Sequence, residues 1–142
     1  MANGWLLKTE PSTYSFAALQ RERRAVWDGV RNPQALNNLA RIRPGDRVLI
    51  YHTADEKAVV GTATALTAAY PDPKQHDPKR LVIDIAPVGA LSRPVPLREI
   101  KANPKLKEWE LARLPRLSVM PVSTAQWAEI ERLAAGPPCS PE

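Results

Sequence analysis

Three segments rich in β-branched and apolar residues follow one another in the middle of the chain, and they constrain its fold most. They are Val48–Tyr51, Ala58–Ala69 and Leu81–Val88, and each is typical of a β-strand. Turn-forming residues separate them, and no regular helical pattern lies between them. Because a doubly wound parallel sheet needs strands that alternate with helices, this order argues against that architecture. It predicts an α+β domain with a small, curled sheet and helices packed around it.

Proline recurs after the second of these segments, at Pro87, Pro94 and Pro96. Since proline cannot donate to a strand ladder, this recurrence favours short edge strands over long central ones. Two further short strands are expected, one over Trp5–Lys8 and one over Leu117–Met120.

Three helices are predicted from capping signals. Ser15 can cap a helix over Phe16–Arg24, and Asn32 precedes a proline at the first position of the next helix. Ser123 and Gln126 have capping-box spacing at the start of the last one. The apolar stripe of that last helix is Trp127, Ile130 and Leu133. Shorter helices are expected near Leu97–Lys101 and Lys107–Arg113.

The residue inventory limits the chemistry that the chain can perform. With 142 residues we expect one domain, 1–136, followed by a Pro-rich tail, 137–142, that is disordered. The single cysteine, Cys139, lies in that tail, and His52 and His76 are the only histidines, so we expect no metal site. No glycine belongs to a phosphate-cradling loop, and we expect neither a cofactor nor a catalytic residue.

No apolar run reaches the roughly 18 residues of a membrane span, and the N-terminus lacks a secretory pattern. We therefore expect a soluble protein that binds no membrane. We place it in the cytoplasm, associated with the nucleoid if its source is bacterial.

Positive charge is concentrated in the N-terminal third of the chain. Residues 1–53 carry eight Lys and Arg against four Asp and Glu, in a chain of net charge +5. An uneven basic surface of this kind favours a polyanionic partner such as a nucleic acid. The predicted phosphate contacts are Arg21, Arg24, Arg41 and Arg43. Such contacts position a nucleic acid but do not specify its sequence.

Several motifs occur in an order that resembles the EVE domain family. The longest is Trp27-Asp28-Gly29-Val30-Arg31-Asn32. Others are Trp5-Leu6-Leu7-Lys8-Thr9-Glu10-Pro11, Gly45-Asp46, Tyr51-His52, Val60-Gly61, Tyr70-Pro71-Asp72-Pro73 and Arg116-Leu117-Ser118-Val119. The resemblance extends from about Trp5 to Leu133. It implies a PUA-like fold, a small, strongly curved β-barrel flanked by helices, and kinship with the YTH and ASCH domains. Two positions depart from the family pattern: Leu36 stands where arginine is common, and Arg80 where tryptophan is common.

The resemblance also implies a non-catalytic reader of a modified nucleic-acid base, with a cytosine derivative in DNA such as 5-methylcytosine favoured and RNA the other partner. The base would be flipped out of its strand. Trp27 would stack on it, while Asn32 and Thr9 would read its edge. The predicted pocket residues are Lys8, Thr9, Trp27, Asp28, Gly29, Val30, Arg31, Asn32, Asn38, Tyr51, His52, Tyr70 and Ser118.

Several of these residues have a structural alternative. Trp27 could pack in the core, His52 could serve only the fold, and Asn38 could be solvated helix surface. Asn32 caps its helix whether or not it also reads a base. We assign Trp109 and Trp127 to packing.

Two other functions stay open. Sibling ASCH-type domains include amidohydrolases that act on acylated cytidine through lysine, threonine and glutamate, and this chain places Lys8, Thr9 and Glu10 in a row. Neighbours along a strand point to opposite faces, which argues against all three meeting one substrate. The other alternative is an RNA-binding module with no preference for a modification.

Overall fold

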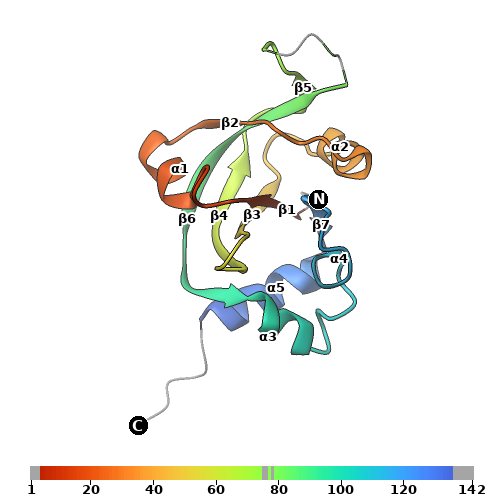
Figure 1. The fold of residues 1–142 in the computed structure, drawn as a ribbon. Coiled ribbons are helices and arrows are strands. Elements are labelled where there is room, and N and C mark those ends of the chain that lie inside the picture. Colours follow the sequence, from red (N-terminus) through yellow and green to blue (C-terminus); the bar gives the residue numbers. More distant parts are fainter. Residues whose placement is uncertain (1–3, 75–76, 78, 136–142) are drawn as a thin grey trace.

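A strongly bent sheet forms the centre of this computed structural model, which describes residues 4–74, 77 and 79–135 (Figure 1). The strand order is β2-β6-β4-β3-β1-β7, with β5 paired to β6. The strands are β1 (Gly4–Thr9), β2 (Ala25–Trp27), β3 (Arg47–His52), β4 (Ala58–Ala65), β5 (Tyr70–Pro71), β6 (Leu81–Pro96) and β7 (Val119–Val122). Among these strands of the described residues, only β1 and β3 pair in parallel. The predicted disordered tail 137–142, its Cys139, and His76 lie outside the described residues.

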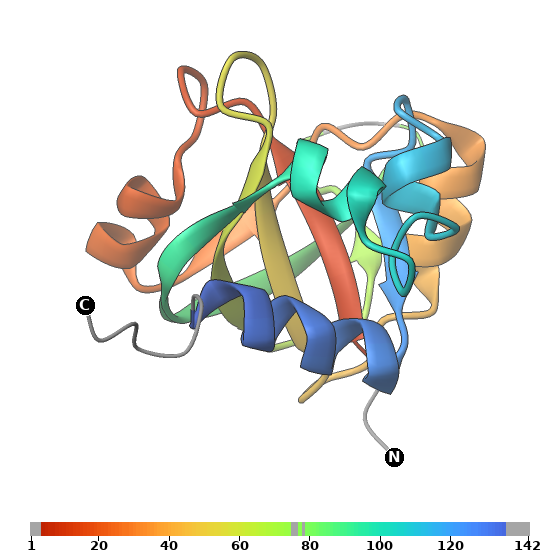
Figure 2. The same cartoon turned by 90° about the horizontal axis from the view of Figure 1, so that it is seen from below.

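Five helices surround the sheet in the described part of the chain. They are α1 (Phe16–Glu22), α2 (Pro33–Ala40), α3 (Leu97–Ala102), α4 (Glu110–Arg113) and α5 (Thr124–Ala134). Figure 1 places α1 and α2 on opposite sides of the sheet, with α3 and α5 beneath it. Seen from below, α5 crosses the strands (Figure 2). The predicted combination of a curled sheet with surrounding helices is therefore confirmed.

The three predicted helix starts are confirmed, each with its cap. The Ser15 side chain accepts the N–H of Ala18, and the Asn32 side chain accepts the N–H of Ala35. Ser123 forms a full capping box at the start of α5. The end of α1 differs from the prediction, because Arg23 takes a left-handed φ of 67° and stops the helix at Glu22.

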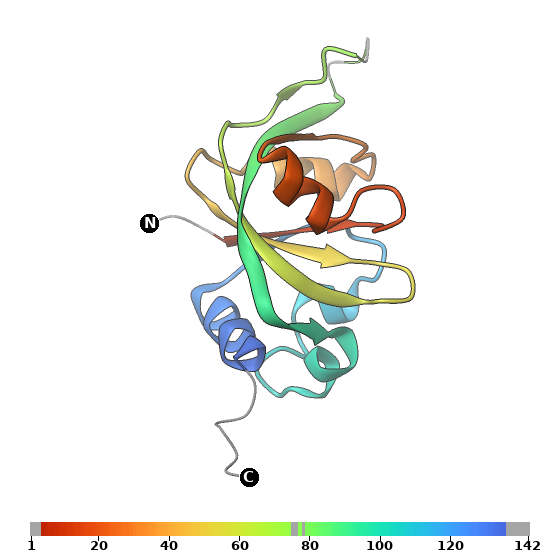
Figure 3. The same cartoon turned by 90° about the vertical axis from the view of Figure 1, so that its left-hand side faces the viewer.

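The prediction of short strands around the prolines is wrong, because β6 is one strand of 16 residues. It bends strongly along its length (Figure 3). Beyond Ile85 the strand pairs only with β4, and β2 and β5 occupy its other edge only from Leu81 to Ile85. The prolines therefore lie where one edge of β6 needs no ladder donor, a position that proline tolerates. Two register shifts against β4 accompany the bend.

The segment after α1 forms a strand that the sequence did not predict. Ala25–Trp27 forms β2, a three-residue edge strand antiparallel to β6. Trp27 pairs with Ile83, which is fully buried. This pairing attaches the start of the Trp27–Asn32 motif to the sheet and fixes the position of Trp27.

The helix α1 packs on β4 at a glycine. A Cβ atom added to Gly61 would overlap the Phe16 ring. Phe16 and Leu19 are the buried residues of α1. The absence of a side chain at Gly61 therefore lets α1 approach the sheet closely.

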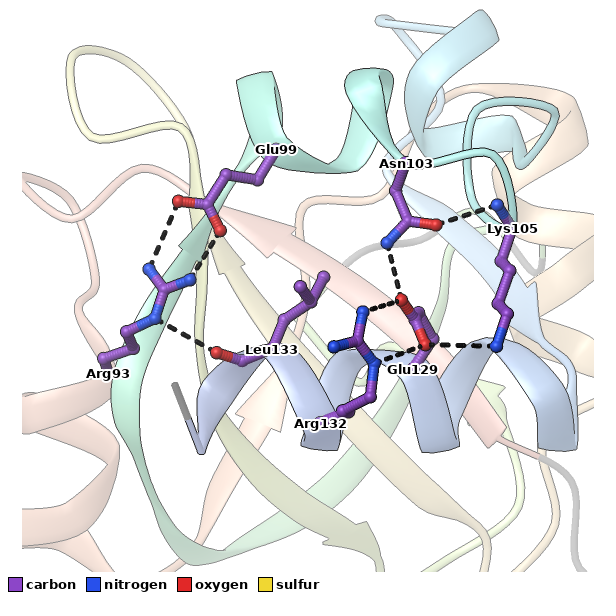
Figure 4. A network of polar contacts seen from close by, with 7 residues as sticks. All are labelled: Arg93, Glu99, Asn103, Lys105, Glu129, Arg132 and Leu133. Atoms are coloured by element: carbon purple, nitrogen blue, oxygen red, sulfur yellow. Dashed lines mark hydrogen bonds and ion pairs between the residues drawn. The ribbon is translucent and has the colours of Figure 1, made fainter. Parts of the chain in front are cut away.

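A polar network attaches α5 to the rest of the molecule (Figure 4). Glu129 is 4% exposed and accepts hydrogen bonds from Asn103 Nδ2 at 2.6 Å and from Arg132 Nε at 3.0 Å. These donors lower the pKa of Glu129 to about 2. Arg93 on β6 donates through Nε to the Leu133 carbonyl at 3.0 Å. The network joins α5 to β6 and to the residue that follows α3.

Candidate functional site

A pocket of about 550 Å³ opens where the end of β1, the turn after it, the C-terminal part of α1 and β2 come together. Its size lies in the ordinary range for ligand sites, roughly 300–1,000 Å³. It is lined by Lys8, Thr9, Thr13, Tyr14, Glu22, Arg24, Ala25, Val26, Trp27, Asp28 and Gly29. Aromatic rings, carboxylates and cations therefore share one opening, a combination that fits a flat, polar ligand.

Two aromatic rings form a corner in the pocket. The Tyr14 and Trp27 centroids are 6.0 Å apart, and the ring planes meet at 78°. Trp27 is only 7% exposed, because it also belongs to the core. A flat ligand can stack on one ring of such a corner and touch the other with its edge.

Tyr14 is held from two directions. The Thr9 hydroxyl donates to the Tyr14 carbonyl oxygen at 2.7 Å, and the Tyr14 hydroxyl donates to Glu22 Oε1 at 2.6 Å. Burial, and then the hydrogen bond to Glu22, raise the pKa of Tyr14 to about 12. The tyrosine therefore stays neutral at ordinary pH, and its hydroxyl proton is directed at Glu22.

Lys8 also lines the pocket. Its Nζ donates to the Pro115 carbonyl oxygen at 3.0 Å and lies 5.5 Å from the centre of the Tyr51 ring. Burial lowers the pKa of Lys8. Because the Thr9 hydroxyl points its proton at Tyr14 while Lys8 contacts Pro115, the two side chains do not pair as a nucleophile and its base.

Arg24 is fixed at the pocket by a carboxylate on β6. Its Nε and Nη2 both donate to Asp84 Oδ2, at 3.1 and 2.6 Å. Asp84 is 8% exposed and also accepts from the Tyr70 hydroxyl. The hydrogen bonds from Tyr70 and Arg24 lower the pKa of Asp84. The Arg24 side chain is 61% exposed, so the guanidinium keeps donors available to solvent or a ligand.

The chain turns sharply between the pocket and α2. Gly29 has a φ of 81°, a left-handed conformation that glycine adopts readily. Val30 then enters the core, and Asn32 caps α2. The motif from Trp27 to Asn32 therefore builds one pocket wall, a turn and a helix start.

Comparison with known proteins assigns this chain to a family. The sequence profile of the EVE domain matches residues 3–133. This chain belongs to the EVE domain family. Thymocyte nuclear protein 1 of Mus musculus is 30% identical, and the match covers 89% of this chain and 71% of that protein.

Solved structures of other proteins share the EVE fold of this chain. A crystal structure of a protein from Agrobacterium tumefaciens is 38% identical, covers 99% of this chain and all of its own, and superposes with a TM-score of 0.90. The crystal structure of human THYN1 in complex with 5-methylcytosine-containing DNA is 27% identical, covers 96% of this chain and 100% of its own, and has a TM-score of 0.87. The predicted PUA-like, strongly curved barrel with flanking helices is confirmed.

In this EVE domain, five of the predicted pocket residues line the pocket: Lys8, Thr9, Trp27, Asp28 and Gly29. Val30 is buried and the Asn32 side chain caps α2, whereas Arg31 lines two further hollows, one of which Gly29 also lines.

The remaining predicted pocket residues serve contacts inside the EVE fold. Asn38 is buried and donates to the Val119 carbonyl oxygen at 2.8 Å. His52 accepts the N–H of Phe16 at 3.0 Å through Nε2, and its Nδ1 contacts Glu56 at 2.8 Å. Their side chains are thus not directed into the pocket.

Tyr51, Tyr70 and Ser118 also stand outside the pocket lining. Tyr51 is 3% exposed beneath Lys8, and burial raises its pKa to about 12. The Tyr70 hydroxyl donates to Asp84, and the Ser118 carbonyl oxygen accepts the N–H of Lys8 at 3.0 Å. Tyr51 and Ser118 thus contact Lys8, and Tyr70 bonds to the carboxylate that holds Arg24.

Of the predicted phosphate contacts, only Arg24 lines the pocket. Arg41 lies 5.4 Å above the Trp5 ring, near a different hollow. Arg21 and Arg43 are exposed. Leu36 and Arg80, the two departures from the family pattern, both line a hollow beside α2.

Sequence reasoning missed five of the residues that line the pocket: Thr13, Tyr14, Glu22, Ala25 and Val26. Tyr14 precedes the N-cap Ser15 and Glu22 ends α1, so the hydrogen bond between them joins the two ends of the helix. No helical spacing rule applies to this pair, because Tyr14 lies outside the helix.

The described residues contain no cluster of three or more His, Cys, Asp or Glu side chains placed to hold a metal ion. Among the helices of the same residues, none has the length and apolar character needed to cross a membrane.

Proposed function

We propose that this EVE domain reads a modified cytosine, with 5-methylcytosine the first candidate, by binding the extruded base in the pocket at Tyr14 and Trp27. The aromatic corner, with centroids 6.0 Å apart in a pocket of about 550 Å³, carries the proposal. It gains support from the human relative, whose complex contains 5-methylcytosine DNA.

Stacking supplies part of the binding free energy. A base stacked on an aromatic side chain contributes about 1–3 kcal/mol. Because extruding a base costs a few kcal/mol, stacking alone does not suffice. Arg24, held at the pocket by Asp84, adds a phosphate contact that helps to offset that cost.

The pocket's carboxylates favour cytosine over thymine. Glu22 and Asp28 are acceptors, and cytosine presents an N4 amine donor where thymine presents an O4 acceptor. Glu22 engages Tyr14 through Oε1, which leaves Oε2 for the amine. Thymine has the same 5-methyl group but would set its carbonyl oxygen against a carboxylate.

Lys8, which lines the same pocket, complements this selection. Its ammonium carries three donors, and the Pro115 carbonyl occupies one of them. The others suit the O2 and N3 acceptors of a cytosine ring. The methyl group itself adds only about 0.8 kcal/mol when buried, roughly a fourfold preference.

The test is a binding panel at fixed salt with matched oligonucleotides that carry cytosine, 5-methylcytosine or thymine at one position. We expect 5-methylcytosine to bind roughly fourfold more tightly than cytosine and at least about tenfold more tightly than thymine. The same panel made once in DNA and once in RNA shows which of the two nucleic acids the protein binds more tightly. Equal affinities across the bases would refute the reader and support a module without a modification preference.

Three variants connect this selectivity to the pocket. Trp27→Phe retains an aromatic core residue and is expected to weaken binding of the modified strand without unfolding. Glu22→Gln and Asp28→Asn are expected to narrow the gap between 5-methylcytosine and thymine. Val88→Ala is the matched control, since Val88 is 68% exposed on β6 and lines no described pocket. Wild-type selectivity in all three pocket variants would show that the base does not bind in this pocket.

A further inference from the structure

A chain of hollows continues from the aromatic pocket along α2. The pocket ends at Gly29, which also lines a small hollow shared with Arg31 and Arg80. Arg31 and Arg80 then line a third hollow of about 480 Å³ beside α2. Because each hollow shares residues with the next, the three are continuous. The third hollow, lined by Arg31, Pro33, Leu36, Lys79 and Arg80 among others, is called here the α2 groove.

The α2 groove combines cations with an apolar floor. Its cations are Arg31, Lys79 and Arg80, and its apolar side chains include Pro33 and Leu36. Arg31 and Lys79 are exposed. Within residues 4–74, 77 and 79–135, neither of them pairs with a carboxylate.

Two carboxylates, Asp72 and Asp77, lie beside the three cations Arg31, Lys79 and Arg80. Asp72 is buried and accepts the N–H of Lys74 at 2.9 Å, so it serves the turn after β5. Asp77 lies 3.9 Å from Arg80 Nε, a long and solvent-exposed pair, and it also accepts the N–H of Lys79. The groove therefore keeps a positive surplus at the exit of the pocket.

We propose that the α2 groove binds the sugar-phosphate backbone of the nucleotides on one side of the extruded base. The inference rests on the proposed function, because it takes the pocket as the place of that base. A strand leaving the pocket past Gly29 meets Arg31 first, then Arg80 and Lys79. Guanidinium groups suit phosphate oxygens through paired donors. Pro33 and Leu36 offer apolar contact to a sugar or to the face of a neighbouring base.

These contacts act on affinity and not on base choice. Phosphate contacts position a strand but carry no sequence information. Each phosphate contact releases a counterion, so the affinity falls with salt in proportion to the number of contacts. Loss of one groove cation therefore has a signature that differs from loss of a pocket residue.

The test measures the affinity for a 5-methylcytosine oligonucleotide across a series of salt concentrations. Arg31→Gln, Lys79→Gln and Arg80→Gln are each expected to lower the slope of log K against log salt by about 0.7–0.9. The ratio of affinities for 5-methylcytosine and cytosine is expected to stay unchanged. Arg98→Gln is the matched control, since Arg98 is exposed on α3, at the far end of the molecule from α2 (Figure 1).

Trimming the oligonucleotide tests the direction of the strand. Removal of the nucleotides on one side of the modified base should abolish the difference between the wild type and the variant that lacks all three cations. Removal on the other side should leave that difference intact. Slopes equal to that of Arg98→Gln, or no dependence on either trim, would overturn the α2 groove as a backbone site.

The two proposals fail in different ways. If the wild type does not distinguish the bases, the proposed function fails. If the wild type distinguishes them and Trp27→Phe weakens that distinction while the groove variants keep the wild-type slope, only the groove inference fails.

Discussion

The Tyr14 and Trp27 rings meet nearly at a right angle, with their centroids 6.0 Å apart. Trp27 belongs to the core and, together with Tyr14, also forms a wall of the pocket. Trp27 is fixed by the pairing of β2 with β6, whereas Tyr14 is fixed by Thr9 and Glu22. The wall is therefore rigid before any ligand binds. A rigid site loses less conformational entropy on binding than a mobile one.

Substitution of Gly61 should damage both stability and the pocket. Gly61→Ala places a methyl group against the Phe16 ring, so α1 must move away from β4. We expect a loss of about 1–3 kcal/mol in the free energy of unfolding, as for other overpacked cores. Because Glu22 is the last residue of α1 and Tyr14 bonds to it, base selectivity should fall as well. Urea denaturation and the binding panel measure the two effects.

The control for this prediction is Gly89→Ala. An added Cβ at Gly89 has no neighbour within 4 Å, and its φ is not in the left-handed region. This variant should therefore retain stability and selectivity. A Gly61→Ala protein as stable as Gly89→Ala would contradict the close packing of α1 on β4.

Removal of the Tyr70 hydroxyl should affect stability but not base selectivity. Tyr70→Phe deletes the hydrogen bond to Asp84, and bonds to charged groups contribute about 1.5–3 kcal/mol. Because this hydrogen bond is the largest cause that lowers the pKa of Asp84, that pKa should rise in the variant. NMR titration of the carboxyl group and a thermal melt measure these changes. Unchanged stability together with lost selectivity would show that Tyr70 takes part in base binding after all.

Glu129 should make the protein sensitive to acid. Its pKa is lowered from 4.5 to about 2, so its contribution to stability is present above pH 4.5 and is lost as the pH falls towards 2. At neutral pH, Glu129→Gln should cost about 1–3 kcal/mol in the free energy of unfolding. The difference between variant and wild type should shrink as the pH falls through this window. Urea midpoints measured at several pH values test this, and a constant difference would be inconsistent with the network around α5.

Local signals made much of the fold predictable. The caps at Ser15, Asn32 and Ser123 lie within a few residues of the N–H groups they satisfy, so the sequence alone reveals them. The length of β6 was not predictable in this way. Its prolines are tolerated only because of which strands lie on each edge, and those strands come from distant parts of the chain.

The same distinction applies to the candidate site. The Trp27 motif identified one wall, because its residues are contiguous in the sequence. The roles of Asn38 and His52 depend on Val119 and Phe16, partners 81 and 36 positions away. Tyr14 was missed because its place opposite Trp27 follows from the course of the turn after β1, which no spacing rule encodes.

The extrusion of a modified base into the aromatic corner is the central claim, and the NMR signal of a ¹³C-labelled 5-methyl group tests it most directly. On binding, the methyl resonance of a 5-methylcytosine oligonucleotide should move upfield under the rings of Tyr14 and Trp27. It should also show nuclear Overhauser contacts to the Trp27 indole. Trp27→Phe should reduce the shift. A bound oligonucleotide whose methyl resonance keeps its duplex position and has no contact with Trp27 would contradict the account.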